Sequence, residues 1–310
     1  AAPTHTSGAR ASFVGLLRGE LRKIAHLRIT WIMAILYAVF IAGSQLVLAG
    51  GPDTASQLRA DPAGSLYNVL EGDLSLVRIF TGIVLLVLTA HVIGLEYQYG
   101  TIRILLGRGV GRLQLLGAKV LALALVGLLL AALGVLIELL FAWGLVGALA
   151  GGAQPLRALD AAYWTDVRFY ALCVLISMGA TLLLGVAASV VGRSLAFGLA
   201  VGLSWFAVDN LLGIPLQLMA RFTHSDLWLK LTGFLLGPLL NRLPDYLAPP
   251  RQIVVSGPHG PQTVAVAVSG FGIQPLVDVH AMQALLVIAV YCAVFVVAAV
   301  LLTWRRDVRE

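Results

Sequence analysis

Six stretches of the sequence are apolar over a length that can cross a lipid bilayer. A spanning helix needs about 20 mostly apolar residues, because the hydrocarbon core is about 30 Å thick. Inside lipid no water satisfies the backbone N–H and C=O groups, so each stretch is restricted to a helix. The stretches are Ile29 to Ala49, Ile79 to Leu95, Val120 to Ala150, Phe169 to Val191, Leu195 to about Val208, and Ala281 to Trp304. The sequence therefore predicts an all-α integral membrane protein with six transmembrane helices.

The composition excludes a soluble domain. Hydrophobic residues make up 59% of the chain and charged residues 12%, and the mean hydropathy is +0.93. Soluble domains are about a quarter charged, so this chain cannot cover its apolar surface with polar side chains. In a soluble protein the net charge of +6 would indicate a nucleic-acid partner. Here the basic residues flank apolar stretches, so we expect membrane lipid as the partner and no nucleic acid.

The basic residues also predict the orientation in the membrane. The segments 1–28, 96–119, 192–194 and 305–310 contain 13 of the 21 Lys and Arg residues. Because cytoplasmic segments are enriched in these residues, we expect both termini in the cytoplasm, in a multi-pass protein of a bacterial-type plasma (inner) membrane. The predicted organisation is a cytoplasmic tail with an interfacial helix at 1–28, a transmembrane domain at 29–304 with external segments 50–78 and 209–280, and a cytoplasmic tail at 305–310.

The segment before the first span predicts a helix that lies on the membrane surface. At 100° per residue, most of the apolar residues from Phe13 to Arg28 fall on one broad face, and the basic residues fall opposite. Glu20 and Arg28 interrupt the apolar face. The alternative is a simple basic flank to the first span.

The segment before the last span is less regular. The apolar stretches Leu211 to Ala220 and Leu227 to Leu240 are too short to cross the bilayer alone, and Pro215 and Pro238 interrupt them. They predict re-entrant or interfacial helices, which require protein or a cavity to satisfy the broken backbone. Two β-branched runs within 252–268, separated by glycine and proline, predict a small external β-hairpin.

The loop between the second and third spans predicts a short helix at the membrane surface. Gly100-Thr101 is typical of a break followed by a helix start, with Thr101 capping a helix that runs through Leu106. Gly107 can end that helix in a left-handed conformation. We expect Glu96 to pair with an arginine or to cap the broken backbone. The basic residues of the loop are Arg103, Arg108 and Arg112, and the alternative is a charged loop that only fixes topology.

Polar and small residues within the spans are candidates for function. His91, Glu138 and Asp209 are substrate-pathway or proton-site candidates, because ionisable groups are costly in lipid. For Glu138 the alternative is a position among the headgroups beyond a protruding span, for Asp209 a cap on the following helix, and for His91 an interior polar residue. Gly198 and Gly202 have helix-packing spacing and are candidates for a dimer contact or an intramolecular contact.

The sequence carries no pattern of a soluble enzyme. A phosphate-binding P-loop needs a lysine directly after a glycine, and none of the three lysines has one. The six histidines lack metal-ligand spacing. We therefore expect a protein that is not an enzyme, with no catalytic residue, no metal site and no cofactor of its own.

Several of these features together resemble the ABC-2-type permeases, the membrane subunits of a class of ATP-driven exporters. In that family a glutamate ends the second span, Gly-Thr, a basic residue and Leu-Leu follow, and a basic residue precedes a lysine at the third span. The segment Leu16 to Lys23 resembles the family's interfacial helix, and the likeness extends to about residue 240. Gly109 departs from the family pattern, which often has proline there. The matching positions are Glu96, Gly100, Thr101, Arg103, Leu105, Leu106, Arg112 and Lys119.

The resemblance implies a permease that works as a homo- or heterodimer with separate cytoplasmic ATPase subunits. ATP and Mg would lie on those partners, and the helix from Thr101 to Leu106 would be the coupling helix that docks on them, with Arg108 in the same loop. Two alternatives remain. One is a proton-coupled secondary transporter, against which the absence of inverted repeats counts. The other is a non-transporting scaffold that recruits an external enzyme or assembly factor.

Overall fold

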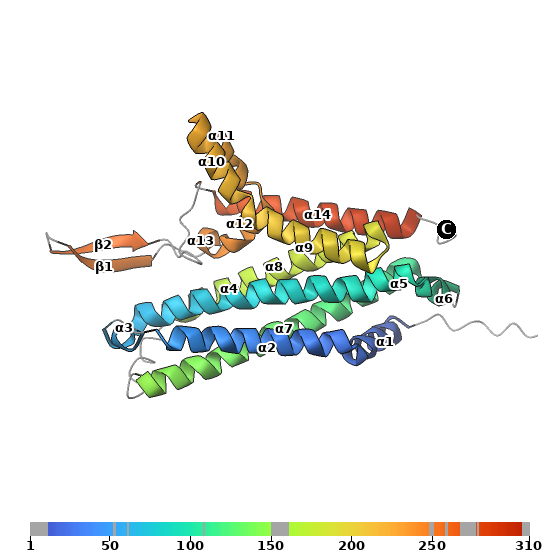
Figure 1. Cartoon of the computed structure of the whole chain (residues 1–310), viewed down its shortest axis with the longest axis horizontal. Coiled ribbons are helices and arrows are strands. Elements are labelled where there is room, and N and C mark those ends of the chain that lie inside the picture. Colours follow the sequence, from blue (N-terminus) through green and yellow to red (C-terminus); the bar gives the residue numbers. More distant parts are fainter. Residues whose placement is uncertain are drawn as a thin grey trace, which may run out of the picture.

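The computed structural model shows a bundle of long helices that run roughly along one axis (Figure 1). It describes residues 12–51, 54–60, 62–107, 109–149, 161–247, 251–257, 260–266, 277 and 279–305.

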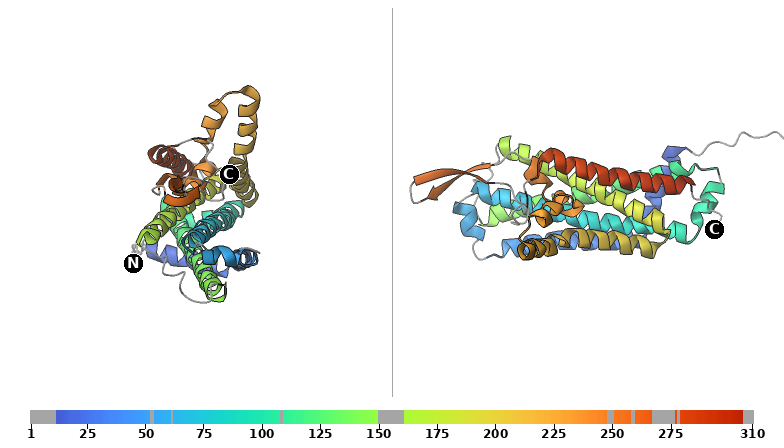
Figure 2. Two further views of the ribbon diagram at one scale, coloured as in Figure 1. Left: turned by 90° about the vertical axis from the view of Figure 1, so that its left-hand side faces the viewer. Right: turned by 90° about the horizontal axis from the view of Figure 1, so that it is seen from above.

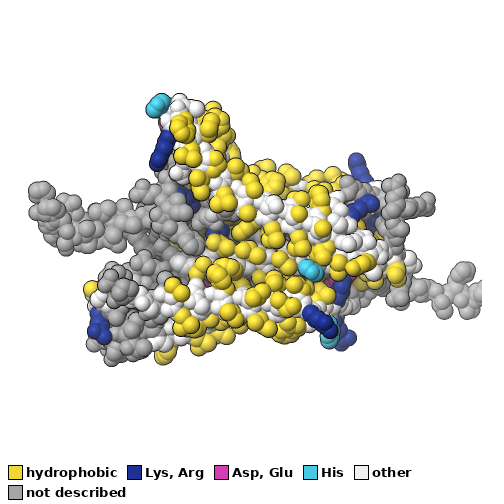
Figure 3. Space-filling model, in the orientation of Figure 1, with side chains coloured by type: hydrophobic (Ala, Val, Ile, Leu, Met, Phe, Trp, Pro, Cys, Tyr) yellow, Lys and Arg dark blue, Asp and Glu magenta, His cyan; other side chains and the backbone are white. Residues whose placement is uncertain are grey.

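The long helices confirm a multi-pass membrane protein. Among the described residues, five helices are long and apolar enough to cross a membrane, and α9 with α10 makes a sixth if this pair, bent by 41°, counts as one span. The bundle helices are α2 (Arg28–Ala49), α4 (Pro62–Thr89), α7 (Arg112–Leu149), α8 (Ala161–Gly192), α9 (Leu195–Leu211) and α14 (Ala281–Arg305). Their outer faces carry many exposed apolar side chains, and Figure 3 shows such side chains along the whole visible length of the bundle.

Two spans begin earlier than the apolar pattern predicts. The predicted loop 50–78 is largely helical, with α3 (Thr54–Ala60) followed by α4, which begins at Pro62. Proline suits the first position of a helix, where its missing N–H has no intrahelical partner. The third span begins at Arg112 and not at residue 120. Hydropathy marks where a helix enters lipid. The backbone hydrogen bonds of a helix can begin before that point, in water, so hydropathy places the starts of these two helices too late.

The core lies where α4 packs against α8, with α2 and α7 beside them. Leu85 and Leu88 of α4, Leu123 of α7 and Val186 of α8 are among its fully or almost fully buried residues. Because lipid tails are as apolar as leucine, these helices are held together by close van der Waals packing and not by removal of leucine from water. This central group of helices is the frame on which the ends of the bundle are mounted.

The two glycines of α9 pack inside the chain. A Cβ added at Gly198 would lie 2.7 Å from Ser189 Oγ, and one at Gly202 would lie 3.2 Å from Leu86 Cδ2. Both glycines are buried, so α9 approaches α8 and α4 closely through them. This is the intramolecular contact that the glycine spacing allowed, and a dimer contact through these glycines stays a prediction.

The segment before the last span consists of short helices. Its prolines start helices and do not interrupt them: Pro215 and Pro238 lie in the first turns of α10 and α12, where the N–H groups lack intrahelical partners. Leu236, Leu239 and Leu243 are buried, so the chain returns into the bundle beside α9 and α14. The helices are α10 (Gly213–Thr223), α11 (Leu227–Thr232), α12 (Leu236–Asn241) and α13 (Leu243–Leu247).

Two antiparallel strands follow these helices. They are β1 (Arg251–Gly257) and β2 (Gly260–Val266), and Arg251 pairs with Val266. The strands extend away from the bundle on the side opposite to α5 and α6 (Figures 1 and 2). Their location outside the cell stays a prediction.

The arrangement places both described chain ends beside the loop between the second and third spans. The interfacial helix α1 (Phe13–His26) and the end of α14 lie at the same end of the bundle as α5 and α6 (Figure 1). The sequence predicts that this end is cytoplasmic, and the shared location is consistent with that prediction.

Cysteine labelling should confirm the orientation. We expect a membrane-impermeant maleimide to label Gly257→Cys but not Gly111→Cys in intact cells, and to label both after permeabilisation, because the first lies at the strand end of the bundle and the second beside α6. Cys292→Ser provides the background, since Cys173 is buried and Cys292 is only half-buried. Labelling of Gly111→Cys in intact cells would contradict the topology.

Candidate functional site

The second span changes its backbone geometry as it reaches the end of the bundle. After α4 the chain forms one turn of π-helix, η1 (Ala90–Gly94), and then the short helix α5 (Leu95–Gln98). Such π-turns are rare in proteins, and those that occur are frequently located at functional sites. Gly100 then adopts a left-handed conformation with φ of 66°, and α6 (Thr101–Gly107) begins at the next residue. The predicted break and short helix are therefore present.

Three details of the loop differ from the prediction. The glycine that turns the chain after α6 is Gly109, with φ of 81°, and not Gly107. Proline is fixed near −65°, so it could not adopt the conformation of Gly109, which explains the departure from the family pattern. The Thr101 hydroxyl donates to the Glu96 carbonyl at 3.4 Å, so it bridges back across the break. The side chains of Arg103 and Arg108 lie outside the described residues.

Four charged side chains form a network under α6. Lys119 Nζ lies 2.7 Å from Glu20 Oε1 and 2.7 Å from Glu96 Oε2. Lys23 Nζ forms an ion pair with the other oxygen of Glu96. We call these four residues the lysine–glutamate network. It joins α1, α5 and α7 and carries two positive and two negative charges.

Three of the four residues are buried and Lys23 is half-buried, which makes the charge balance energetically important. Lys119 is 1% exposed, Glu20 6% and Glu96 8%. An ion taken out of water costs several kcal/mol unless partners compensate its charge, and here each carboxylate has an ammonium partner. Burial and the nearby Lys119 ammonium lower the pKa of Lys23 to about 8, while Glu20 opposes this change.

The sequence suggested only part of this network. We expected Glu96 to pair with an arginine or to cap the broken backbone, and among the described side chains its ion-pair partners are two lysines, one from the interfacial helix and one from the third span. Glu20 was expected only to interrupt the apolar face of its helix. An acidic residue on the buried face of an amphipathic helix is a signal of a buried cation, and Lys119 supplies that cation.

Apolar contacts fix the inner face of α6. Ile102, Val110 and Leu115 are buried together, and the side chains of Leu105 and Leu106 pack against them. The opposite face is open, since Ile104 is 60% exposed. The helix is therefore mounted on the bundle through one face and presents an apolar side chain on the other.

The ends of several other helices contact the segments on either side of α6. A Cβ on Gly94 would lie 2.7 Å from the Ser194 carbonyl oxygen, so the π-turn touches the α8–α9 turn closely. Leu195 N–H donates to Gln98 Oε1 at 3.2 Å, and Arg112 Nη1 donates to the Trp304 carbonyl at 3.2 Å. These contacts join the π-turn and α5 to the start of α9, and the start of α7 to the end of α14.

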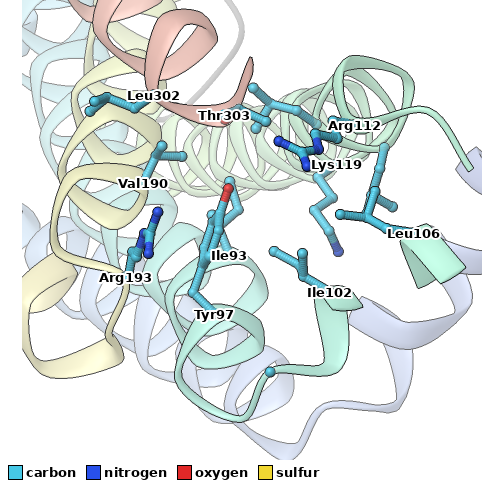
Figure 4. Close-up of a pocket in the computed structure, with 13 residues that line it drawn as sticks. Ile93, Tyr97, Ile102, Leu106, Arg112, Lys119, Val190, Arg193, Leu302 and Thr303 are labelled. Atoms are coloured by element: carbon cyan, nitrogen blue, oxygen red, sulfur yellow. The ribbon is translucent and has the colours of Figure 1, made fainter. Parts of the chain in front are cut away.

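A cavity of about 70 Å³ lies between these elements. Figure 4 shows Ile102 and Leu106 of α6 on one side, Val190 and Arg193 on another, and Tyr97 between them. Basic residues line it together with apolar ones: Ile93, Tyr97, Gly100, Ile102, Leu106, Arg112, Leu115, Leu116, Lys119, Val190, Arg193, Leu302 and Thr303.

The three ionisable candidates within the spans lie on different helices. His91 Nδ1 is 2.9 Å from the Val87 carbonyl oxygen in the turn before it. Asp209 is 7% exposed and accepts a hydrogen bond from Gly237 N–H in the first turn of α12, which is not the helix that directly follows it. Glu138 is 5% exposed within α7, so it is enclosed by protein. In the described part of the chain, no group of three His, Cys, Asp or Glu residues could hold a metal ion.

Comparison with known proteins identifies the family. The comparison with individual curated proteins found no match. The family model described as ABC-2 family transporter protein matches residues 16–209, which is more than half of the chain and includes α1, the short helix α6 and five of the bundle helices. This match, the multi-pass helical bundle and the helix mounted between the second and third spans agree, and the chain is a membrane protein of the ABC-2 transporter family.

Proposed function

We propose that this chain is a permease subunit that couples to a separate cytoplasmic ATPase through α6. The observation that carries the proposal is the mounting of α6: one face is packed on the bundle, and the other presents an exposed apolar residue, Ile104. Exposed apolar side chains at the core of an interface are suited to binding a partner protein. In a dimer of permease subunits each copy would receive one ATPase.

The contacts around α6 suggest how a movement would be transmitted. A force on α6 acts on α5 across the break at Gly100, and α5 carries Glu96. The lysine–glutamate network passes the force from Glu96 to α1 through Lys23 and to α7 through Lys119. The close contact at Gly94 passes it to the α8–α9 turn. One short helix would then move several spans as a unit.

Substitution of Ile104 should test the docking surface. Ile104→Glu should reduce the amount of ATPase that copurifies with the full-length protein from its native membranes at least about tenfold. An unpaired carboxylate buried in an apolar contact costs more than the ~1.4 kcal/mol that this factor represents. The measurement is ATP hydrolysis in the eluate per mole of permease.

Ile104→Leu is the matched control, because it keeps the size and apolar character of the side chain and should copurify the ATPase as the wild type does. Equal ATP hydrolysis with Ile104→Glu and Ile104→Leu would contradict docking through α6. An eluate of the wild type without ATP hydrolysis would contradict the proposed function itself.

A further inference from the structure

The short helix α12 is held at both of its ends by charged side chains from two spans. At its start, Asp209 of α9 accepts a hydrogen bond from Gly237 N–H. At its last residue, Asn241 Oδ1 accepts a hydrogen bond from Arg78 Nη2 of α4 at 2.6 Å. A carboxylate at the N-terminal end of a helix and a cation at its C-terminal end are the electrostatically favourable arrangement. We call these four residues the α12 clasp.

We propose that α12 is a gate of the permease, which the α12 clasp holds closed and which opens during ATP turnover. A gate needs a transport path and an ATPase that drives it, so the proposal rests on the proposed function. The helix lies in the half of the bundle nearer the strands, away from α6 (Figure 1). It would therefore close the side that the basic residues predict to be external.

The α12 clasp buries two charges that a purely structural contact does not need. Arg78 and Asp209 are each 7% exposed. In the described part of the chain neither of them has an ion-pair partner. Burying a charge is costly, and an apolar contact of the same size often holds two elements together at least as well. Charges kept at this cost are suited to fixing one conformation of a movable element.

A small cavity beside the clasp provides for the open state. Arg78 and Asp209 both line it, and its volume is about 20 Å³. One water needs ~10–15 Å³ and two or more polar partners, so water can enter here and solvate both side chains. When α12 moves away, the guanidinium and the carboxylate lose their contacts to it and can pair across this cavity. The charges then stay compensated in both positions of α12, as a two-state element requires.

The chain on either side of α12 allows the helix to move as a unit. Leu235 before it has an extended backbone, and Arg242 after it has left the helical conformation. The buried residues Leu236, Leu239 and Leu240 pack in an apolar cluster with side chains of α8 and α14. Apolar contacts are non-directional, so they permit a displacement, whereas the hydrogen bonds of the clasp select one position.

The native Cys173 can report whether α12 is in place. It lies in α8, is buried, and belongs to the same apolar cluster as the leucines of α12. The test uses full-length protein with Cys292→Ser in lipid nanodiscs and a small, charged methanethiosulfonate reagent. The reagent reaches Cys173 only when α12 leaves the bundle, so the labelling rate follows the population of the open state.

Loss of either charged residue should release the gate. Without nucleotide, Arg78→Met and Asp209→Leu should each raise the labelling rate at least about tenfold, because an unpaired buried polar group costs more than this factor represents. The matched controls are Lys230→Met and Asp226→Leu, the same substitutions at exposed positions beside α11, which should leave the rate unchanged. Unchanged rates in both clasp variants, or equal rises in the controls, would overturn the proposal.

A second buried reporter separates gate opening from general unfolding. Ala122 is fully buried in α7, in the other apolar cluster. Ala122→Cys with Cys173→Ser should stay unlabelled when Arg78→Met is added. Labelling there at the raised rate of Cys173 would mean that the variant unfolds, and would overturn the proposal.

ATP turnover should open the gate in the complex with an intact clasp. With the copurified ATPase, ATP should raise the labelling rate of Cys173 about threefold or more, through an equal gain in the open population. ATP hydrolysis with an unchanged labelling rate would overturn the gate and leave the permease function standing. A complex without ATP hydrolysis would contradict the proposed function instead, and the rates of the clasp variants without nucleotide would still decide whether the clasp holds α12.

Discussion

Replacement of Lys119 by methionine should destabilise the protein by about 3–5 kcal/mol, the cost of leaving buried charges without their partner. Lys119 is 1% exposed and forms an ion pair with Glu20. Methionine has a similar length and no charge, so packing is largely kept while Glu20 loses its ammonium partner. We expect a large drop in thermal stability in detergent and a poor yield of monodisperse protein.

A second substitution should restore most of that stability. In Lys119→Met with Glu20→Gln, the remaining charges are Lys23 and Glu96, which form their own ion pair. The double variant is then electrically balanced, so its unfolding temperature should be much closer to the wild type than that of the single variant. A single variant as stable as the wild type would contradict the buried network. A double variant that is no more stable than the single one would mean that Lys119 acts through packing alone.

Glu96→Gln and Gly100→Val should separate ATP hydrolysis from movement of the membrane domain. The first removes the carboxylate that joins α5 to Lys23 and Lys119, at a cost on the order of 1–3 kcal/mol. The second places a β-branched residue at a φ of 66°, which redirects the start of α6. Both changes are too small to undo the bundle but sufficient to alter the geometry through which α6 acts on it.

The measurement does not require knowledge of the cargo. A spin label at Gly144→Cys, where an added Cβ meets no atom within 4 Å, reports the distance between the two permease copies by electron paramagnetic resonance. With ATP and vanadate the wild-type complex should change this distance. Both variants should hydrolyse ATP with the distance unchanged.

Gly107→Val is the control for the glycine substitution. Gly107 is the last residue of α6, without a positive φ and with open space around an added Cβ, so valine should be tolerated and coupling preserved. A distance change of wild-type size in both Glu96→Gln and Gly100→Val would mean that the loop is a topological anchor and not the transmission element.

The sequence by itself determined the fold class, the approximate spans and the position of the short helix after Gly100. These features follow from local properties: the length of apolar runs, the position of glycine, and the enrichment of basic residues on one side. The resemblance to the ABC-2 permeases rested on the same local order and was confirmed by the family match over residues 16–209. The predicted helix ends were less accurate, because α4 and α7 continue beyond their apolar parts.

Only the tertiary structure decided which residues meet at the site. Glu96 pairs with Lys23, which is 73 residues away. Glu20 changed from an interruption of an apolar face to the buried partner of Lys119, and Gly198 and Gly202 were found to pack within the chain. The physical reason is that charge pairing and close packing depend on which helices lie side by side. Hydropathy and turn signals restrict each segment separately and leave that arrangement open.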